Sequence, residues 1–410
     1  MTGFRSLGLL LAACGAVHGY SVLAHQAIID SAWKDSIAPL LAQRFPQATA
    51  DDLLHARAYA YGGCIVQDMG YYPFSSKFFS DLVHYVRSGD FVAALIADSR
   101  DIDEYAFALG ALAHYTADSL GHPQAVNASV PLLYPKLRKK YGPVVTYEDN
   151  RSAHLKVEFG FDVIEVAEGN YAPEAYHDRI GFEVSERLLE AAFLETYGLD
   201  LKNLFNNLDA AVGSYRFAVR TLLPEATRVA WSLNKDQIRQ ARPSITKRRF
   251  LYNLSRSGYE REWGREYRRP GLGARILAFL FRIVPKVGPF SAFGLRPPTP
   301  DTQRLFMASF NATLTRYREL LVEAGAGRLH LENFNLDTGK PTAPADYRLA
   351  DEAYSKLART LVEKGAAPPA PLRDDLLAFF ADPAKPIATR RNRRVWNDTM
   401  EAVGQLQTRR

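Results

Sequence analysis

Apolar residues recur at intervals of three and four positions from Ser21 to about Arg220, and alternating runs of β-branched residues are few. This period gathers apolar side chains on one face of a helix, whereas a strand needs strict alternation. The sequence therefore predicts an all-α fold of packed helices. We expect these helices over residues 22–45, 50–60, 75–88, 102–120, 146–169, 173–196 and 201–220.

The chain is long enough for about two or three domains, since it has 410 residues. Hydrophobic residues at 47% and charged residues at 23% exclude disordered and collagen-like classes. Two cysteines are too few for a disulfide scaffold or a zinc site made of thiolates. Because the composition changes near residue 240, we expect a helical domain over residues 20–240 and a basic, mainly helical C-terminal extension over residues 241–410.

The N-terminus has the pattern of a secretory signal. Arg5 precedes an apolar run over residues 7–17, which is too short to cross a bilayer. We expect residues 1–19 to be removed before Tyr20 and the mature protein to be exported, either to the periplasm or into the medium. In the competing interpretation, the run Leu-Ala-Ala-Cys is a lipoprotein signal and the protein is lipid-anchored through Cys14.

Positive charge is concentrated in one segment. Residues 241–300 hold 13 Lys and Arg against 3 Asp and Glu, a net charge of +10, so the rest of the chain sums to −4 within the total of +6. Such asymmetry indicates an anionic partner for this segment. Residues 242–296 interleave cations with aromatic and apolar residues, which is typical of a peripheral membrane contact. The same pattern also fits a helix packed on the rest of the chain with its arginine heads in solvent.

Two histidine–carboxylate pairs have the spacing of metal chelators. His114 and Asp118 are four residues apart in an apolar helix, so they lie on one face and can bind one ion, and His122 continues the same line. His154 and Glu158 repeat the spacing on a later helix. An ionised carboxylate buried in such a helix needs a compensating cation or hydrogen-bond donor, and a zinc ion would compensate it. A mixed imidazole and carboxylate set favours zinc over calcium.

With these motifs the sequence resembles the bacterial zinc-dependent phospholipase C family, whose fold is shared with fungal single-strand-specific nucleases. The resemblance covers about residues 20–220. It rests on the two pairs, on His122, and on three further residues in the order that the family has them: His25, Asp68 in Gln-Asp-Met, and His84.

The resemblance implies up to three zinc ions. One ion would be held by Asp68, His84, His114 and Asp118, and a second by His122, His154, Glu158 and a water molecule. The third would use His25, Asp118 as a bridging carboxylate, and the free α-amino and carbonyl groups of Tyr20. The sequence departs from the family in two places: Tyr20 stands where Trp is common, and His122 follows Asp118 after a shorter gap.

The implied activity is hydrolysis of a phosphodiester by water that the metal ions activate. Asp68 would act both as a ligand and as the acceptor of a proton from that water. The resemblance thus implies a phospholipase C that cleaves glycerophospholipids to diacylglycerol and a phosphorylated headgroup, with no obligate nucleic acid. Two alternatives stay open: a single-strand-specific nuclease on the same scaffold, and a non-catalytic metal-stabilised binding protein.

Overall fold

The N-terminal part of the protein is helical. The structure, a computed structural model, describes residues 22–72, 74–168, 181–217, 219 and 296–408. The elements of this part are α2 (Val22–Ala32), the π-helix η1 (Trp33–Ile37), α3 (Ala38–Arg44), α4 (Ala50–Gly63), the 3-10 helix η2 (Val66–Tyr71), α5 (Lys77–Tyr85), α6 (Ser88–Asp98), α7 (Ile102–Gly121), the π-helix η3 (His122–Val126), α8 (Asn127–Leu133), α9 (Pro135–Tyr141), α10 (Arg151–Glu168), α12 (Glu186–Tyr197), the 3-10 helix η4 (Leu201–Asn203) and α13 (Leu208–Phe217).

The C-terminal part adds further helices and one short hairpin. Its elements are α17 (Pro300–Gly325), β1 (Phe334–Asn335), β2 (Lys340–Pro341), α18 (Arg348–Glu363), α19 (Ala370–Phe379), the 3-10 helix η7 (Ala388–Arg391) and α20 (Arg393–Thr408). The strands pair antiparallel, with Phe334 opposite Pro341 and Asn335 opposite Lys340. Among the described residues these are the only strands, so the all-α prediction is confirmed.

Side-chain caps fix where several helices begin. Thr49 and Asp52 form a reciprocal capping box at the start of α4, and the side chain of Asp101 accepts a hydrogen bond from the backbone N–H of Glu104 at the start of α7 (2.9 Å). These caps satisfy N–H groups that have no partner inside the helix. The start of α7 sets the register of the helix that carries two predicted metal ligands.

Two glycines allow α4 and α7 to pack backbone against backbone. A Cβ atom on Gly63 would lie 1.9 Å from the carbonyl oxygen of Phe107, and one on Gly110 would lie 2.2 Å from the carbonyl oxygen of Ala60. Only glycine fits such an approach. As a result, the end of α4 and the residues after it lie directly against the middle of α7.

The region after α5 differs from its prediction. The helix expected over residues 75–88 ends at Tyr85, because Val86 is extended and Arg87 adopts a left-handed backbone with φ of 51°. A separate helix, α6, then begins at Ser88 and was not predicted. Since Arg87 is not a glycine, its left-handed conformation has no strong sequence signal.

The helix expected over residues 102–120 continues past its predicted end. The chain continues from α7 through the π-helical turn η3 into α8, and only the hydrogen-bonding pattern changes at His122. Pro123 lies in the first turn of η3, where its missing N–H costs little. The helical path therefore places His122 one turn beyond Asp118 on the same side.

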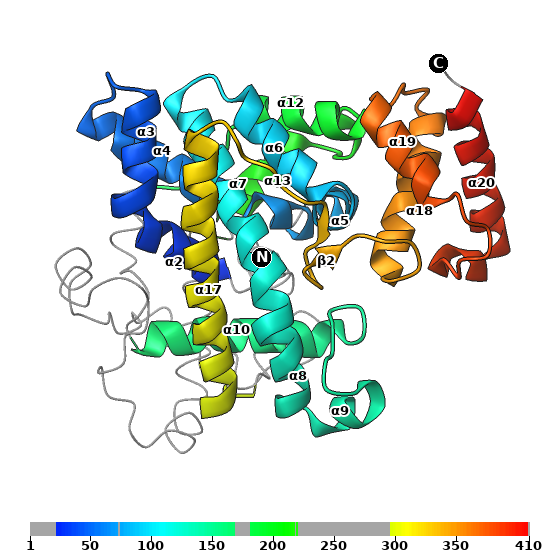
Figure 1. The fold of residues 1–410 in the computed structure, drawn as a ribbon, viewed down its shortest axis with the longest axis horizontal. Helices are drawn as coiled ribbons and strands as arrows, with labels where there is room; N and C mark the ends of the chain where they lie inside the picture. Colours follow the sequence, from blue (N-terminus) through cyan, green and yellow to red (C-terminus); the bar gives the residue numbers. More distant parts are fainter. Residues whose placement is uncertain (1–21, 73, 169–180, 218, 220–295, 409–410) are drawn as a thin grey trace, which may run out of the picture.

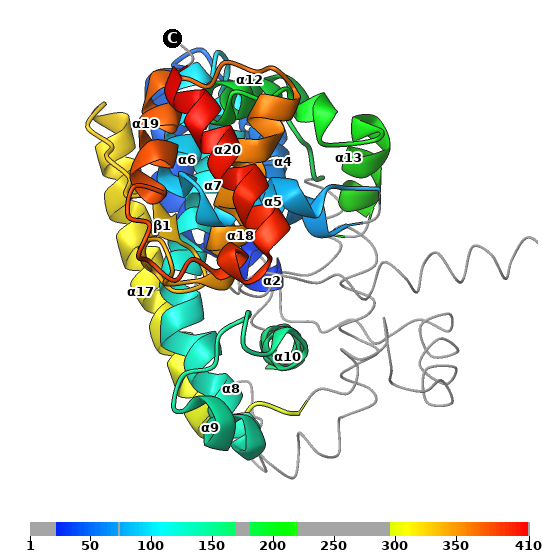
Figure 2. The ribbon, with the colours of Figure 1, turned by 90° about the vertical axis from the view of Figure 1, so that its right-hand side faces the viewer.

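The C-terminal part shares one hydrophobic core with the N-terminal part. Helix α17 runs beside α7 and α8 (Figures 1 and 2). The ring of Phe306 on α17 stacks on Phe161 of α10 with centroids 4.7 Å apart, and the hydroxyl of Tyr317 donates to the carbonyl of Leu109 (2.9 Å). The domain boundary expected near residue 240 and the segment 242–296 lie outside the described residues, apart from Arg296.

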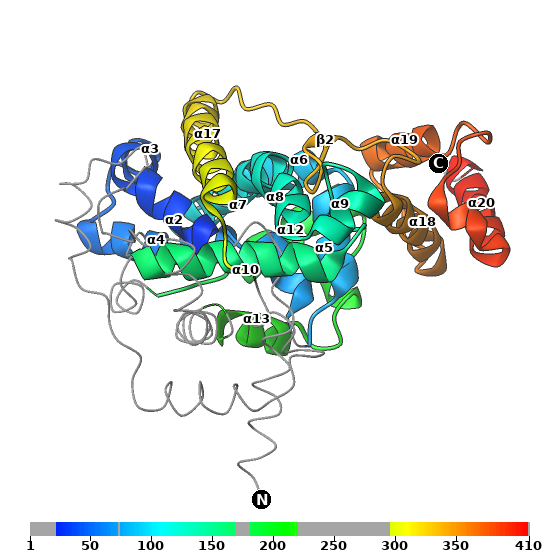
Figure 3. The ribbon, with the colours of Figure 1, turned by 90° about the horizontal axis from the view of Figure 1, so that it is seen from below.

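Helix α10 crosses the molecule along its long axis, whereas α18, α19 and α20 gather at one end (Figure 3). The start of α10 therefore reaches the same region as η2, α5 and η3. In the described part of the chain, every helix is too short or too polar to cross a membrane.

Candidate metal centre

The structure brings eight of the nine predicted ligands into one buried region. They come from six elements: His25 from α2, Asp68 from η2, His84 from α5, His114 and Asp118 from α7, His122 from η3, and His154 and Glu158 from α10. All eight residues are buried. The ninth, Tyr20, lies outside the described residues, as does Cys14.

Asp118 stands between the histidines of four elements. Its Oδ1 atom lies 3.3 Å from Nε2 of His25 and 3.8 Å from Nε2 of His122. Its Oδ2 atom lies 3.1 Å from Nε2 of His114 and 3.5 Å from Nε2 of His84. A carboxylate in this position can bridge two ions, one on each oxygen.

The remaining ligands gather on two sides of Asp118. On one side Asp68 Oδ1 lies 3.5 Å from Nε2 of His84. On the other, Glu158 Oε1 lies 2.8 Å from Nε2 of His154 and 3.4 Å from Nε2 of His122. Three groups of ligand atoms are close enough to hold an ion each: His25, His114 and Asp118; Asp68, His84 and His114; and His122, His154 and Glu158.

Backbone carbonyls orient two of the histidines. Nδ1 of His84 lies 2.8 Å from the carbonyl oxygen of Ser80, and Nδ1 of His114 lies 3.0 Å from that of Cys64. Each Nδ1–H donates to its carbonyl, which directs Nε2 to the centre. The contact to Cys64 depends on the close packing of α4 and α7.

The donor set fits a metal ion. Both carboxylate oxygens of Asp68 and of Glu158 are buried without a hydrogen bond. A buried carboxylate with no donor is costly unless a cation compensates it. Imidazole nitrogens mixed with carboxylate oxygens are the ligands that zinc prefers.

Burial and neighbouring charges shift the pKa values of several candidate ligands. Burial and the neighbouring carboxylates of Asp118 and Asp68 raise the pKa of Glu158 well above its usual range. Burial alone would lower the pKa of His84, but Asp118 and Asp68 raise it to about 10. Burial and the charge of His122 lower the pKa of His154 to about 3. Strong shifts of opposite sign in one buried cluster are typical of a functional site.

Comparison with known proteins finds a family that part of the chain resembles. A family profile described as zinc dependent phospholipase C matches residues 24–207, the range that contains all eight clustered ligands. Residues 24–207 therefore resemble the zinc-dependent phospholipase C family. The match supports a zinc-dependent phosphodiesterase-like hydrolase. Searches of curated proteins and of solved structures found no significant match.

A pocket lies beside the candidate metal centre. Its walls combine predicted ligands with aromatic rings and one further carboxylate: Asp68, Tyr71, His84, Tyr85, His122, Tyr147, His154, Glu158 and Asp337. The ring of Tyr147 meets His154 edge-on with centroids 5.6 Å apart. Tyrosine rings therefore line the space beside the candidate ligands.

Asp337 is a residue of the candidate metal centre that no sequence motif predicts. Asp337 lies beyond the family match, and its Oδ1 atom is 3.2 Å from Nδ1 of His122. The run from Asn335 to Gly339 has the composition of a turn, which predicts a local conformation. Nothing in that run indicates that it contacts a histidine so far away in the chain.

Proposed function

We propose that the protein is a phospholipase C that hydrolyses glycerophospholipids to diacylglycerol and a phosphorylated headgroup, with up to three zinc ions. The observation that carries the proposal is the meeting of three ligand groups in one buried centre inside the family domain. His114 belongs to two of these groups, and His122 of the third group lies 3.8 Å from Asp118 of the first.

Zinc bound at these residues would supply a Lewis acid that lowers the pKa of water and neutralises charge on the phosphodiester. Asp118 would contribute to more than one ion site, because its oxygens face His25, His84 and His122, which belong to three different ligand groups. Asp68 lines the pocket, and both its oxygens lack a hydrogen bond. In this proposal Asp68 is also positioned to accept a proton during hydrolysis.

The pocket wall favours a substrate with an apolar portion. Tyr71, Tyr85 and Tyr147 place ring surfaces next to the ligands. In a phospholipase, these rings would exclude water from the scissile bond and contact the glycerol backbone or the headgroup.

Export and membrane contact belong to the same proposal. We propose that the signal over residues 1–19 is removed before Tyr20, whose new α-amino group would complete the ligand set around His25. The basic segment 242–296 would contact anionic lipid. N-terminal sequencing of the exported protein, combined with zinc analysis, tests both the cleavage site and the ion count. A start at a lipidated Cys14 would contradict the cleavage proposed here.

The substrate class is tested by incubating the purified, zinc-loaded protein separately with phosphatidylcholine vesicles and with single-stranded DNA. We expect diacylglycerol and phosphocholine from the vesicles. Release of nucleotides without diacylglycerol would instead establish a nuclease on the same scaffold. Bound zinc with neither product would favour a non-catalytic binding protein.

A further inference from the structure

The turn between β1 and β2 brings a carboxylate from the C-terminal part to the metal centre. Asp337 is buried, and the family match ends at residue 207, well before it. Its carboxylate faces three side chains. Oδ1 lies 3.2 Å from Nδ1 of His122, while Oδ2 accepts hydrogen bonds from the hydroxyl groups of Tyr85 (2.8 Å) and Tyr347.

Backbone contacts hold this turn against the helices that carry the ligands. The N–H of Leu336 donates to the carbonyl of His84 (3.1 Å), which ties the turn to the backbone of a predicted ligand. The side-chain amide of Asn127 donates to the carbonyl of Asp337 (2.7 Å). Asp337 is therefore fixed through its own backbone and through that of its neighbour.

A glycine lets the turn approach α7 closely. Gly339 has a φ of 65°, and a Cβ atom there would lie 2.2 Å from the carbonyl oxygen of Ser119. The turn therefore fits against α7 only with glycine at this position.

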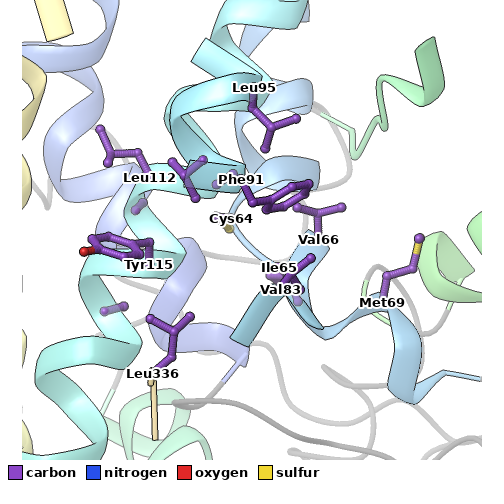
Figure 4. Close-up of a cluster of buried hydrophobic side chains, with 14 of the residues drawn as sticks. Cys64, Ile65, Val66, Met69, Val83, Phe91, Leu95, Leu112, Tyr115 and Leu336 are labelled. Carbon is purple, nitrogen blue, oxygen red and sulfur yellow. The ribbon is translucent and has the colours of Figure 1, made fainter. Parts of the chain in front are cut away.

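The residue before Asp337 is part of the core. Leu336 is fully buried and belongs to the same hydrophobic cluster as Val83, Phe91 and Leu112 (Figure 4). Earlier in the same segment, the carbonyl of Glu332 accepts a hydrogen bond from the hydroxyl of Tyr115 (2.7 Å). Asp337 is thus held at His122 by apolar packing and by hydrogen bonds on both sides.

We propose that Asp337 is a positioning residue of the zinc centre, which rests on the proposed function. Its Oδ1 atom, 3.2 Å from Nδ1 of His122, would accept the Nδ1–H, so that Nε2 of His122, which faces Glu158 and Asp118, would carry the lone pair for zinc. The C-terminal part thereby orients His122 within the ligand group of His122, His154 and Glu158.

His122 differs from His84 and His114 in the acceptor that its Nδ1 atom faces. His84 and His114 donate Nδ1–H to neutral backbone carbonyls. His122 faces an anion instead, which makes its imidazole a stronger zinc ligand. The two tyrosine hydroxyls on Oδ2 fix the carboxylate so that Oδ1 remains turned to His122.

The test compares zinc retention by the full-length parent and by Asp337→Asn during dialysis against a graded chelator buffer. Loss of such a partner costs about 10–100-fold in metal affinity. We expect one zinc ion per chain to leave Asp337→Asn at a correspondingly lower chelator concentration, while the other ions leave as in the parent. Unfolding temperatures of both metal-free proteins show whether the variant folds.

Two variants separate positioning from simple docking of the turn. Asn333→Ala removes the hydrogen bonds between Asn333 and Asp90, which hold the same segment without touching a histidine. It should lower the unfolding temperature and leave zinc retention unchanged. Tyr347→Phe removes one donor to Asp337 but keeps the carboxylate at His122, so its zinc retention should lie between those of the parent and Asp337→Asn.

Equal zinc retention by Asp337→Asn and the parent would overturn the inference. So would equal zinc loss by Asn333→Ala and Asp337→Asn, because docking alone would then explain the effect. Should Asp337→Asn fail to fold, zinc retention by Tyr347→Phe decides between positioning of His122 and docking of the turn. A parent that binds no zinc, or binds zinc without hydrolysing phospholipid, would instead contradict the proposed function.

Discussion

Each oriented histidine of the centre uses its two ring nitrogens differently. Nδ1 contacts an acceptor on the protein, which is a backbone carbonyl for His84 and His114 and a carboxylate for His122. Nε2 faces Asp118 in all three. This division fixes the orientation of each ring before an ion arrives, so zinc binding does not require the rings to reorient.

Asp118 is the residue on which most of the centre depends. We expect Asp118→Asn to lose zinc and to reduce phospholipid hydrolysis by at least about 100-fold, more than loss of an outer partner would. Zinc analysis and a diacylglycerol assay check this. The matched control is Asp103→Asn on the same helix, because Asp103 also pairs with a histidine, His55, but at the surface. Full activity in Asp118→Asn would contradict its assignment as a ligand.

Zinc uptake at pH 7 should release protons. The carboxylates keep the pKa of metal-free His84 at about 10, so its ring is protonated at pH 7 and must lose a proton to bind zinc. The pKa of His154 is about 3, so that ring is already neutral and contributes none. Zinc affinity should therefore rise as the pH increases from 7 towards 10.

Titration calorimetry in buffers of different ionisation enthalpy measures the number of protons released. We expect a positive number at pH 7 that falls when His84 is replaced by Ala. A titration with no proton release would show that His84 is neutral before zinc binds.

At the scale of elements, the centre depends on how closely α4 and α7 approach. Gly63 and Gly110 bring the two backbones together, and this approach puts the carbonyl of Cys64 within reach of His114. The π-helical turn after α7 also positions a candidate ligand, because it keeps His122 on the same side as Asp118. Helix contacts, and not loops, position most of the ligands.

Gly110→Ala should destabilise the protein by about 1–3 kcal/mol, the usual cost of overpacking a core. The new methyl group would collide with the carbonyl of Ala60 and push α7 away from α4. Chemical denaturation measures the free energy of unfolding, and zinc content reports whether His114 has moved. The control is Gly404→Ala on α20, where a Cβ atom meets nothing within 4 Å.

For Gly404→Ala we expect unchanged stability or a gain of up to about 1 kcal/mol, because alanine is the better helix former. If Gly110→Ala and Gly404→Ala had the same free energy of unfolding, the close approach of α4 and α7 would not limit stability.

At the scale of the whole molecule, the C-terminal part and the metal centre are joined. Helix α17 packs on α7 and α10, and the turn that carries Asp337 packs between His84 and His122. The helices that supply ligands are thus held by one core that spans both parts of the chain. Ions bound at the centre would stabilise contacts between segments far apart in sequence.

Removal of zinc should lower the unfolding temperature by several degrees. A ligand that binds only the folded state contributes about 4 kcal/mol at about 1,000 times its Kd, and without it the carboxylates of Asp68, Asp118 and Glu158 share one buried region. Calorimetric scans with and without chelator check this. Re-addition of zinc should restore the original transition, whereas magnesium should not. An unchanged transition would mean that the centre holds no ion under these conditions.

The sequence by itself determined the helical class and the pairs His114–Asp118 and His154–Glu158, because both follow from the local period of a helix. The resemblance to a family added His25, Asp68 and His84 as candidates. Only the tertiary structure decided that these side chains converge on Asp118, that the chain stays helical past His122, and that Asp337 contacts His122. Such contacts join segments whose separation along the chain exceeds the reach of any local pattern, so they depend on how the helices pack.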